Sequence, residues 1–238
     1  RLRSWGLTTV ARQILLPEER GQRPYPTDIQ LSPAFERDRT VFFATRRHGV
    51  WVSHEAGDNS FKILDTEGVE IRSLAISPAF ATDGTIFTVL KSGAVFRSVD
   101  GGLTWAGISS VGGHTQLAGD LYLKMSPDYQ HDQTVFAYGL FGLQKSVDGG
   151  QNWNDVVFPG VVTPSVTGFG VSTNYADDGT VLAAVKGGAL YLSTDSGNRF
   201  EPLDRSVEAS THELTHIEFS PDYQDDRIVY LASEETLF

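Results

Sequence analysis

Hydrophobic residues occur along this chain in short runs of strand length, and turn-forming residues stand between the runs. The stretch 70–109 shows four of them in succession, at 70–77, 85–90, 94–98 and 104–109. Each run is rich in β-branched and aromatic residues, which favour strands. The 24 glycines and 10 prolines are spread between the runs, a pattern typical of many strands joined by tight turns. The chain is therefore predicted to be all-β.

One phrase recurs five times at a nearly constant spacing. It starts with Leu31-Ser-Pro-Ala-Phe, returns at Ile76 and Met125, and has weaker copies at Val171 and Phe219. Successive serines of the phrase are 45, 49, 46 and 48 residues apart, at Ser32, Ser77, Ser126, Ser172 and Ser220. A period of about 47 residues with four strands in each unit predicts a β-propeller of five four-stranded blades.

The same phrase marks where the first strand of each blade ends. Its proline cannot donate to a strand ladder, so the strand stops there. The pairs Asp83-Gly84 and Asp178-Gly179 favour a tight turn into the second strand.

A second phrase follows the first by about 20 residues, one loop further along each repeat. It reads Ser98-Val-Asp-Gly-Gly-Leu-Thr-Trp105 in the second repeat, with copies from Ser146 and Ser193 and a looser one from Ser53. Its aspartate can accept backbone N–H groups of its own turn, and the glycine two residues later can adopt a positive φ. The aromatic residue that ends it is expected to pack inward and fix the blade edge. The structural residues of these turns are Ser98, Asp100, Gly102, Thr104, Trp105, Ser146, Asp148, Gly150, Trp153, Ser193, Asp195, Gly197 and Phe200.

These turns resemble the Asp boxes of the BNR-repeat propeller family, the sialidase-like and sortilin-like superfamily, and the resemblance covers nearly the whole chain. The resemblance implies a single propeller domain over residues 1–238. Its predicted blades are residues 26–65, 66–110, 117–158, 165–204, and 211–238 together with 1–10.

The last repeat stops inside its third strand, and Trp5 stands where a fourth strand would begin. We therefore expect the N-terminal strand to complete blade five and close the ring, since closure removes an exposed sheet edge. The alternative is that the five repeats belong to a propeller of six to eight blades.

Charge and composition narrow the classes of partner. With 30 acidic and 19 basic residues the net charge is −11, which disfavours nucleic acid. No apolar stretch approaches the roughly 20 residues of a membrane span, so direct membrane insertion is not expected. There is no cysteine, hence neither a disulfide nor a thiolate metal site.

The loops between second and third strands are expected on the face opposite the Ser-Pro turns and Asp boxes. Together they offer a rim of charged and aromatic side chains that could hold a sugar or a peptide, although ordinary solvated turns look similar. The candidate binding residues are Arg46, Arg47, His48, Lys91, Tyr138, Phe141, Lys186, Glu234 and Glu235.

Two motifs suggest metals, and both have simpler explanations. His212, Glu213 and His216 have the spacing of a zinc protease motif, but they align with a strand, where histidines four residues apart are about 13 Å apart. Asp128 with Asp132, and the acidic residues at 222, 225 and 226, could attract calcium, but turn capping explains their spacing equally. No cofactor is predicted.

The function predicted is a non-enzymatic interaction or scaffold propeller, a protein- or glycan-binding module of a secreted or cell-surface bacterial protein. One alternative is a sialidase-like glycoside hydrolase, but the chain has no Arg-Ile-Pro phrase and no arginine cluster drawn from separate blades. Another is a propeller similar to photosystem assembly factors. The arginine-rich binding face implied by that similarity conflicts with the acidic surplus, although residues 1–23 are locally basic.

Overall fold

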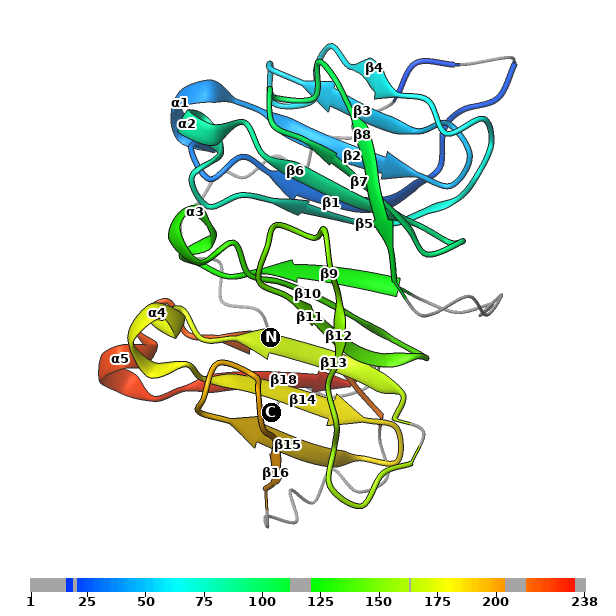
Figure 1. The fold of residues 1–238 in the computed structure, drawn as a ribbon. Helices are drawn as coiled ribbons and strands as arrows, with labels where there is room; N and C mark the ends of the chain where they lie inside the picture. Colours follow the sequence, from blue (N-terminus) through cyan, green and yellow to red (C-terminus); the bar gives the residue numbers. More distant parts are fainter. Residues whose placement is uncertain (1–15, 19–20, 112–120, 163, 204–212, 234–238) are drawn as a thin grey trace, which may run out of the picture.

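In the computed structural model, residues 16–18, 21–111, 121–162, 164–203 and 213–233 are described. They form five antiparallel sheets that follow one another as successive blades (Figure 1). This confirms the all-β, five-bladed propeller prediction.

Within each blade the strands are hydrogen-bonded in chain order, from the inner strand to the outer one. Blade one contains β1 (Pro26–Leu31), β2 (Val41–Thr45), β3 (Val50–Ser53) and β4 (Phe61–Leu64). Blade two contains β5 (Ile71–Ile76), β6 (Ile86–Leu90), β7 (Ala94–Ser98) and β8 (Ala106–Ser110). Blade three contains β9 (Leu121–Met125), β10 (Val135–Gly139), β11 (Gly142–Ser146) and β12 (Asn154–Asp155). Blade four contains β13 (Val166–Val171), β14 (Val181–Val185), β15 (Ala189–Ser193) and β16 (Glu201–Pro202).

Blade five shows two strands among the described residues, β17 (Leu214–Phe219) and β18 (Val229–Ser233). The strand predicted from residues 1–10, with Trp5, lies outside the described residues, as does the predicted third strand of this blade. Closure of the ring by the N-terminus therefore stays a prediction, and so does the alternative of a larger ring.

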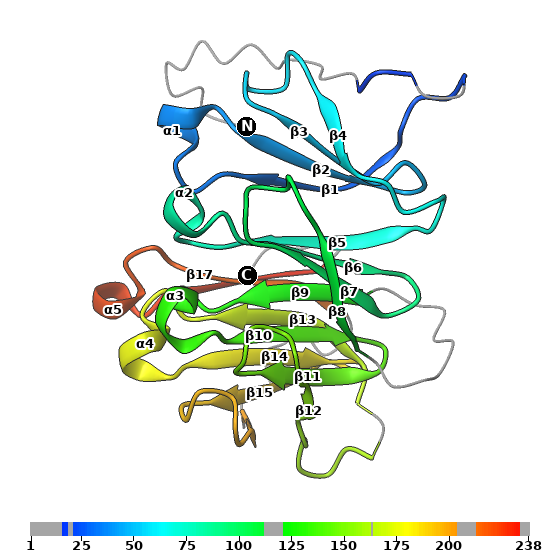
Figure 2. The ribbon, with the colours of Figure 1, turned by 45° about the horizontal axis from the view of Figure 1, so that its top comes forward.

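A one-turn helix joins the first and second strands of every blade, where the sequence had predicted a tight turn. These helices are α1 (Phe35–Asp38), α2 (Phe80–Asp83), α3 (Tyr129–Asp132), α4 (Tyr175–Asp178) and α5 (Tyr223–Asp226). In blade two the Ser77 hydroxyl donates to Asp83 at 2.6 Å, and the other oxygen of Asp83 accepts the Thr85 N–H at 2.8 Å. Gly84 ends the helix at φ 58°. The same Ser–Asp hydrogen bond occurs in all five blades, and all five helices lie at one end of the molecule (Figure 2).

The Ser-x-Asp-x-Gly turns lie against these helices. Gly101 N–H donates to the carbonyl of Gly84 at 3.0 Å. Asp100 accepts the Thr104 N–H at 2.9 Å, and Gly102 has φ 94°. Hydrogen bonds from the Thr104 side chain and backbone and from Ser98 lower the pKa of Asp100 to about 2. The carboxylate is thus an integral part of its turn.

Hydrophobic clusters fill the seams between neighbouring blades. One cluster joins Phe42 and Val52 of blade one to Leu74 and Ile86 of blade two, and each following seam has its own. In blades one to four both faces are covered, so the second strands β2, β6, β10 and β14 are buried throughout, whereas β18 of blade five is only partly buried. This explains why their sequences are continuous apolar runs instead of alternating ones.

Candidate functional site

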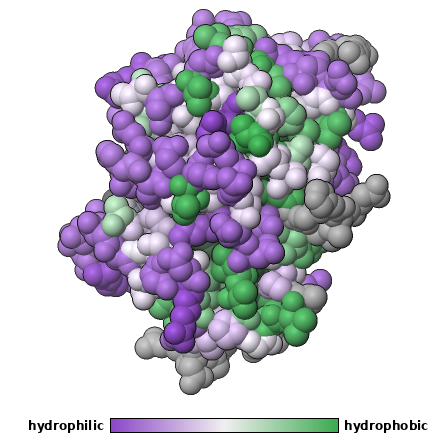
Figure 3. All heavy atoms as spheres, viewed as in Figure 1, coloured by the Kyte–Doolittle hydropathy of each residue, from purple (hydrophilic) through white to green (hydrophobic). Residues whose placement is uncertain are grey.

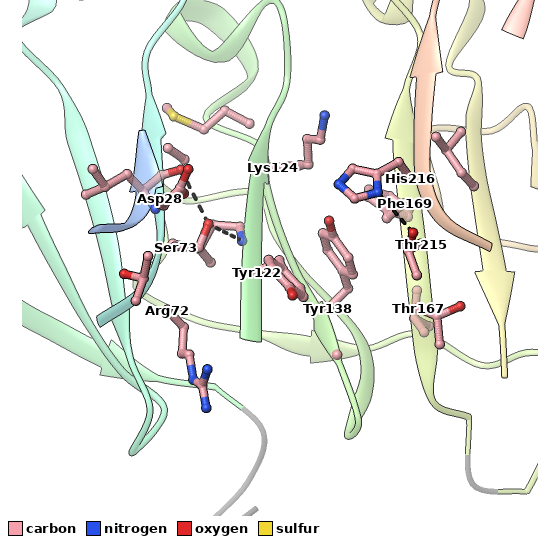
Figure 4. A pocket seen from close by; sticks show the side chains of 18 of the residues that line it. Asp28, Arg72, Ser73, Tyr122, Lys124, Tyr138, Thr167, Phe169, Thr215 and His216 are labelled. Atoms are coloured by element: carbon pink, nitrogen blue, oxygen red, sulfur yellow. Dashed lines mark hydrogen bonds between the residues drawn. The ribbon is translucent and has the colours of Figure 1, made fainter. Parts of the chain in front are cut away.

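The five inner strands β1, β5, β9, β13 and β17 surround a central cavity of about 960 Å³ (Figure 4). A cavity of this volume is within the range of ligand pockets, roughly 300–1,000 Å³. Residues near both ends of the inner strands line it, from Pro78 beside the helical turns to Lys91 and Leu140 in the loops of the opposite face. We call the opposite face the loop face.

Several polar side chains of the inner strands are used to hold the walls of the cavity together. Asp28 accepts the Leu74 N–H of the next blade at 2.8 Å, and Ser73 accepts the Leu123 N–H at 3.3 Å. The hydroxyl of Thr167 donates to the carbonyl of Leu214 at 2.7 Å. Neighbouring inner strands lie in different sheets, so these side-chain bonds replace the missing ladder and fix the positions of the wall.

Two stacked tyrosines form the aromatic part of the wall. The rings of Tyr122 and Tyr138 are 5.2 Å apart at an interplanar angle of 27°, and Tyr138 also contacts Phe169, 5.6 Å away. Tyr138 is buried, and its burial, together with the nearby Tyr122, Glu218 and Asp28, raises the pKa of its hydroxyl. Tyr122 is 37% exposed and lines the cavity, so it offers a ring face whose back is supported by Tyr138.

The charges around the cavity balance. Three acidic and three basic residues line it: Asp28, Glu213, Glu218, Arg72, Lys91 and Lys124. The ammonium of Lys124 on β9 lies 2.5 Å from the carboxylate of Glu218 on β17, a contact that spans blade four. Although the chain as a whole carries −11, the formal charges of these six residues sum to zero, with Arg72 and Lys91 at the mouth included.

Basic groups gather at the mouth on the loop face. The carboxylate of Glu70 is approached by Arg72 at 3.2 Å, by Arg46 at 3.7 Å and by Lys91 at 3.9 Å. Glu70 is mostly buried, whereas the side chains of Arg46 and Lys91 are 62% and 43% exposed. Three cations around one carboxylate leave an excess of positive charge at this point of the surface.

The residues predicted to form the binding face lie in different kinds of position in the structure. Arg46, Arg47 and His48 occupy the β2–β3 loop, and the corresponding loops of blades two and four carry Lys91 and Lys186. Phe141, in the loop of blade three, is partly buried against the hydrophobic core. Tyr138 differs from the prediction: it is part of strand β10 and faces the cavity, not the rim. Glu234 and Glu235 lie outside the described residues.

The structure also shows where the residues of the two predicted metal motifs lie. His216 is on strand β17, as the alignment predicted, and its Nδ1 is 3.0 Å from the Thr215 hydroxyl, while His212 lies outside the described residues. Asp132 accepts the Ser126 hydroxyl and the Thr134 N–H, which is the turn-capping role. Within the described ranges, no group of three or more histidine, cysteine or acidic side chains is placed to hold a metal ion.

The sequence interpretation overlooked the inner-strand positions that face the cavity. These are found two and four residues before the repeated serine, and they carry Asp28, Gln30, Tyr122, Lys124 and Glu218, together with His216, which its motif suggested only as a metal ligand. Alternation along a strand places these two positions on one face, so the repeat alignment contained the signal. Binding residues were expected in loops and not on inner strands.

The sequence matches no protein-family model, and no curated protein matches it. The fold is similar to that of an ancestral GH74 enzyme, with a TM-score of 0.70 and 18% identity over 90% of this chain and 31% of the other. It is also similar to YCF48 bound to D1 peptide (TM-score 0.59, 14% identity, 94% and 65% covered). A nidogen/laminin complex gives a TM-score of 0.61 at 11% identity, with 93% and 81% covered.

These similarities show the propeller fold and nothing finer. The chain spans about a third of the length of the GH74 enzyme and about two thirds of the YCF48 chain. Among the described helices, each a single turn, there is no segment long and apolar enough to cross a membrane.

Proposed function

We propose that this chain is an interaction propeller that binds a protein partner on its loop face, around the mouth of the central cavity. The observation that carries the proposal is the excess of positive charge at the mouth, where Arg46, Arg72 and Lys91 surround Glu70. Arginine is enriched in protein interfaces, and a basic site on an acidic protein attracts and orients an acidic partner surface.

The loop face also exposes apolar side chains, which are a further common feature of protein interfaces. Leu140 is 47% exposed, and in the loop between β12 and β13 Val157 and Val162 are 76% and 96% exposed. Figure 3 shows hydrophobic side chains exposed in the lower half of the view, where blades three and four lie in Figure 1, as well as higher up. Exposed apolar groups beside a basic cluster fit a partner surface that combines acidic and apolar residues.

Two of the similar propellers were solved with a peptide or a protein, YCF48 with D1 peptide and nidogen with laminin. They support a protein partner by analogy of fold alone. A secreted or cell-surface location is part of the same proposal, because it belongs to the interaction propellers that the repeats resemble.

The hydrolase alternative has less support at the cavity. Glycoside hydrolysis needs two carboxyl groups free to act on either side of the scissile bond. Asp28 is held by a backbone N–H and by Gln30, and Glu218 is held by Lys124. Two of the three acidic residues of the described lining are therefore engaged in positioning the walls.

A photo-crosslinking amino acid at two positions tests the proposed face. We expect p-benzoylphenylalanine in place of Arg47, on the loop face, to capture a partner from the native host, and the same residue in place of Leu103, 84% exposed on the opposite face, to capture none. The captured protein, once purified, should bind the double variant Arg46→Glu, Lys91→Glu at least about tenfold more weakly, since charge-assisted contacts are lost.

The control is Arg199→Glu, which reverses the charge of a 77% exposed arginine on the other face and should leave the affinity unchanged. Equal capture from both positions, or an affinity that the double charge reversal does not change, would contradict the proposal.

A further inference from the structure

We infer that the central cavity is a binding site for a neutral sugar ring, which stacks on Tyr122 and is held at its edge by polar side chains of blades one, three and five. This inference is independent of the protein partner proposed above, because it concerns the channel interior and not the rim. It starts from Tyr122, which is more exposed than Tyr138 and Phe169, the other tyrosine and phenylalanine of the described lining.

Tyr122 has the features of a stacking platform. Its ring is backed by Tyr138, which is in turn backed by Phe169, so the platform is rigid and its exposed face is preformed. At the equivalent position of their strands, blades one and two carry Asp28 and Ser73, which bond to the next blade. Blade three carries Tyr122 at this position, and its ring lines the cavity (Figure 4).

The polar groups around the platform come from several blades. The cavity lining includes the ammonium of Lys124, the imidazole of His216, the hydroxyl of Thr215 and the amide of Gln30 (Figure 4 labels the first three). They include both donors and acceptors. A sugar presents C–H groups on its ring face and hydroxyls on its edge, so it can satisfy the aromatic platform and these polar groups together.

An aromatic side chain of a peptide would fit the platform less well. Its ring edge carries at most one polar group, the hydroxyl of tyrosine or the N–H of tryptophan. It would therefore remove the polar lining from water while replacing few of the lost hydrogen bonds, which is costly. A charged ligand is also disfavoured, because the charged side chains near the platform already have partners: Lys124 pairs with Glu218, and Asp28 accepts hydrogen bonds from the Leu74 N–H and the Gln30 amide. The chemistry of the cavity thus selects a neutral, hydroxyl-rich ring.

Saturation-transfer NMR on the full chain can test this with defined probes. The probes are the methyl glycosides of glucose, xylose, galactose and N-acetylglucosamine, the anionic sugar glucuronate, and the aromatic peptide mimics N-acetyltyrosinamide and N-acetyltryptophanamide. We expect at least one neutral glycoside to bind, with saturation strongest on the protons of one ring face.

Tyr122→Ala should weaken that binding about tenfold, the effect of losing one aromatic stacking contact, whereas Tyr122→Phe should retain it. Tyr25→Ala is the matched control, because Tyr25 is a 71% exposed tyrosine outside the cavity lining. If Tyr122→Ala does not fold, judged by its thermal melt, Lys124→Met tests the same site by removing one donor and should also weaken binding.

Four outcomes would overturn the inference: no probe binds at millimolar concentration, only the aromatic amides bind, only glucuronate binds, or the affinity for the glycoside is unchanged in the Tyr122 or Lys124 variant. None of these outcomes depends on the loop-face crosslinks. Failure of the sugar site is therefore distinguishable from failure of the proposed protein interface.

Discussion

The two sides of strand β13 are packed in opposite ways. Toward blade three, Phe169 meets Phe136 at 4.9 Å and Tyr138 at 5.6 Å, so large rings fill that seam. Toward blade five, β13 presents Gly168 and Gly170, and a Cβ added to Gly170 would lie 2.6 Å from the Ile217 side chain and 3.1 Å from its carbonyl oxygen. One strand thus keeps one neighbour at a distance and lets the other approach closely.

The difference teaches that a propeller of similar repeats need not have equal seams. The aromatic seam is wide enough to expose the face of Tyr122 to the cavity, whereas the glycine seam brings β17 close enough for the Thr167 hydroxyl to reach the Leu214 carbonyl at 2.7 Å. Cavity shape is therefore set by which seam carries the large residues.

Phe169→Ala should have the largest effect, because it empties the aromatic seam. Phe169 is almost completely buried, and removing a buried phenylalanine side chain costs about 3–5 kcal/mol of the free energy of unfolding. Urea denaturation measures the loss. Phe61→Ala is the control, since Phe61 is 51% exposed, and should cost far less. Equal losses in the two variants would show that the aromatic seam is not a close-packed one.

Gly170→Ala should cause the next largest loss of stability, because the added methyl group overpacks the seam between β13 and blade five. The added methyl group meets both the side chain and the backbone of Ile217, and overpacking of this kind costs about 1–3 kcal/mol. Gly107→Ala is the matched strand control: its added Cβ would be in ordinary contact with Phe96, 3.5 Å away. The control should be neutral or slightly stabilising, and a similar loss from both variants would refute the close approach.

Lys124→Gln should have a smaller, salt-dependent effect. The Lys124–Glu218 pair reaches across blade four and so spans both seams, but Glu218 is 65% exposed. Exposed ion pairs contribute about 0.2–1 kcal/mol and weaken as salt is added. Thermal melts should differ between this variant and the parent chain at low salt and converge in high salt. A difference that persists in high salt would mean that packing of the lysine stem matters more than its charge.

Asp148→Asn should have the smallest effect on stability, and only at a pH where the Asp148 carboxylate of the parent chain is charged. The backbone N–H of Asn152, its side chain and the Ser146 hydroxyl lower the pKa of Asp148 to about 2, below the roughly 3.9 of an unfolded aspartate. The stabilisation by the carboxylate is therefore complete near neutral pH and is lost as the pH falls from about 4 to about 2. Asparagine keeps one acceptor oxygen, which limits the loss.

Thermal melts across this pH range should show the Asn variant less stable at pH 7 and equal to the parent below pH 2. The turn touches a seam as well, since Gly150 lies against Phe87 and Ile108 of blade two. A pH-independent difference would mean that the seam contacts, not the carboxylate, account for the effect.

The strands could be predicted from the sequence because the repeat places them. The strands of blade two are at 71–76, 86–90, 94–98 and 106–110, within two residues of their predicted bounds. The one-turn helices were missed since four residues are too few to show a helical period, and Asp83-Gly84 looks the same in a tight turn.

The candidate site was predicted less well. Arg46 and Lys91 were predicted because they lie in loops, where binding residues are expected, whereas Tyr122 and Lys124 belong to an inner strand. Their side chains meet those of blade five only because the ring curves back, and a spacing along the chain does not reveal that. The close packing of β13 against blade five was missed for the same reason. Gly168 and Gly170 are required only because Ile217 lies beside them in the folded chain, and the sequence does not show that contact.

The Ser–Asp bond that holds each helical turn has a consequence for how such a protein can change over generations. It recurs in all five units, while the position four residues before the bonded serine carries aspartate, serine, tyrosine, glycine and histidine in turn. The residues that make a unit fold are thus separate from those that give it a chemical character. After duplication, one unit can acquire a new contact with a ligand while its copies keep the architecture intact, so specificity can diversify one unit at a time.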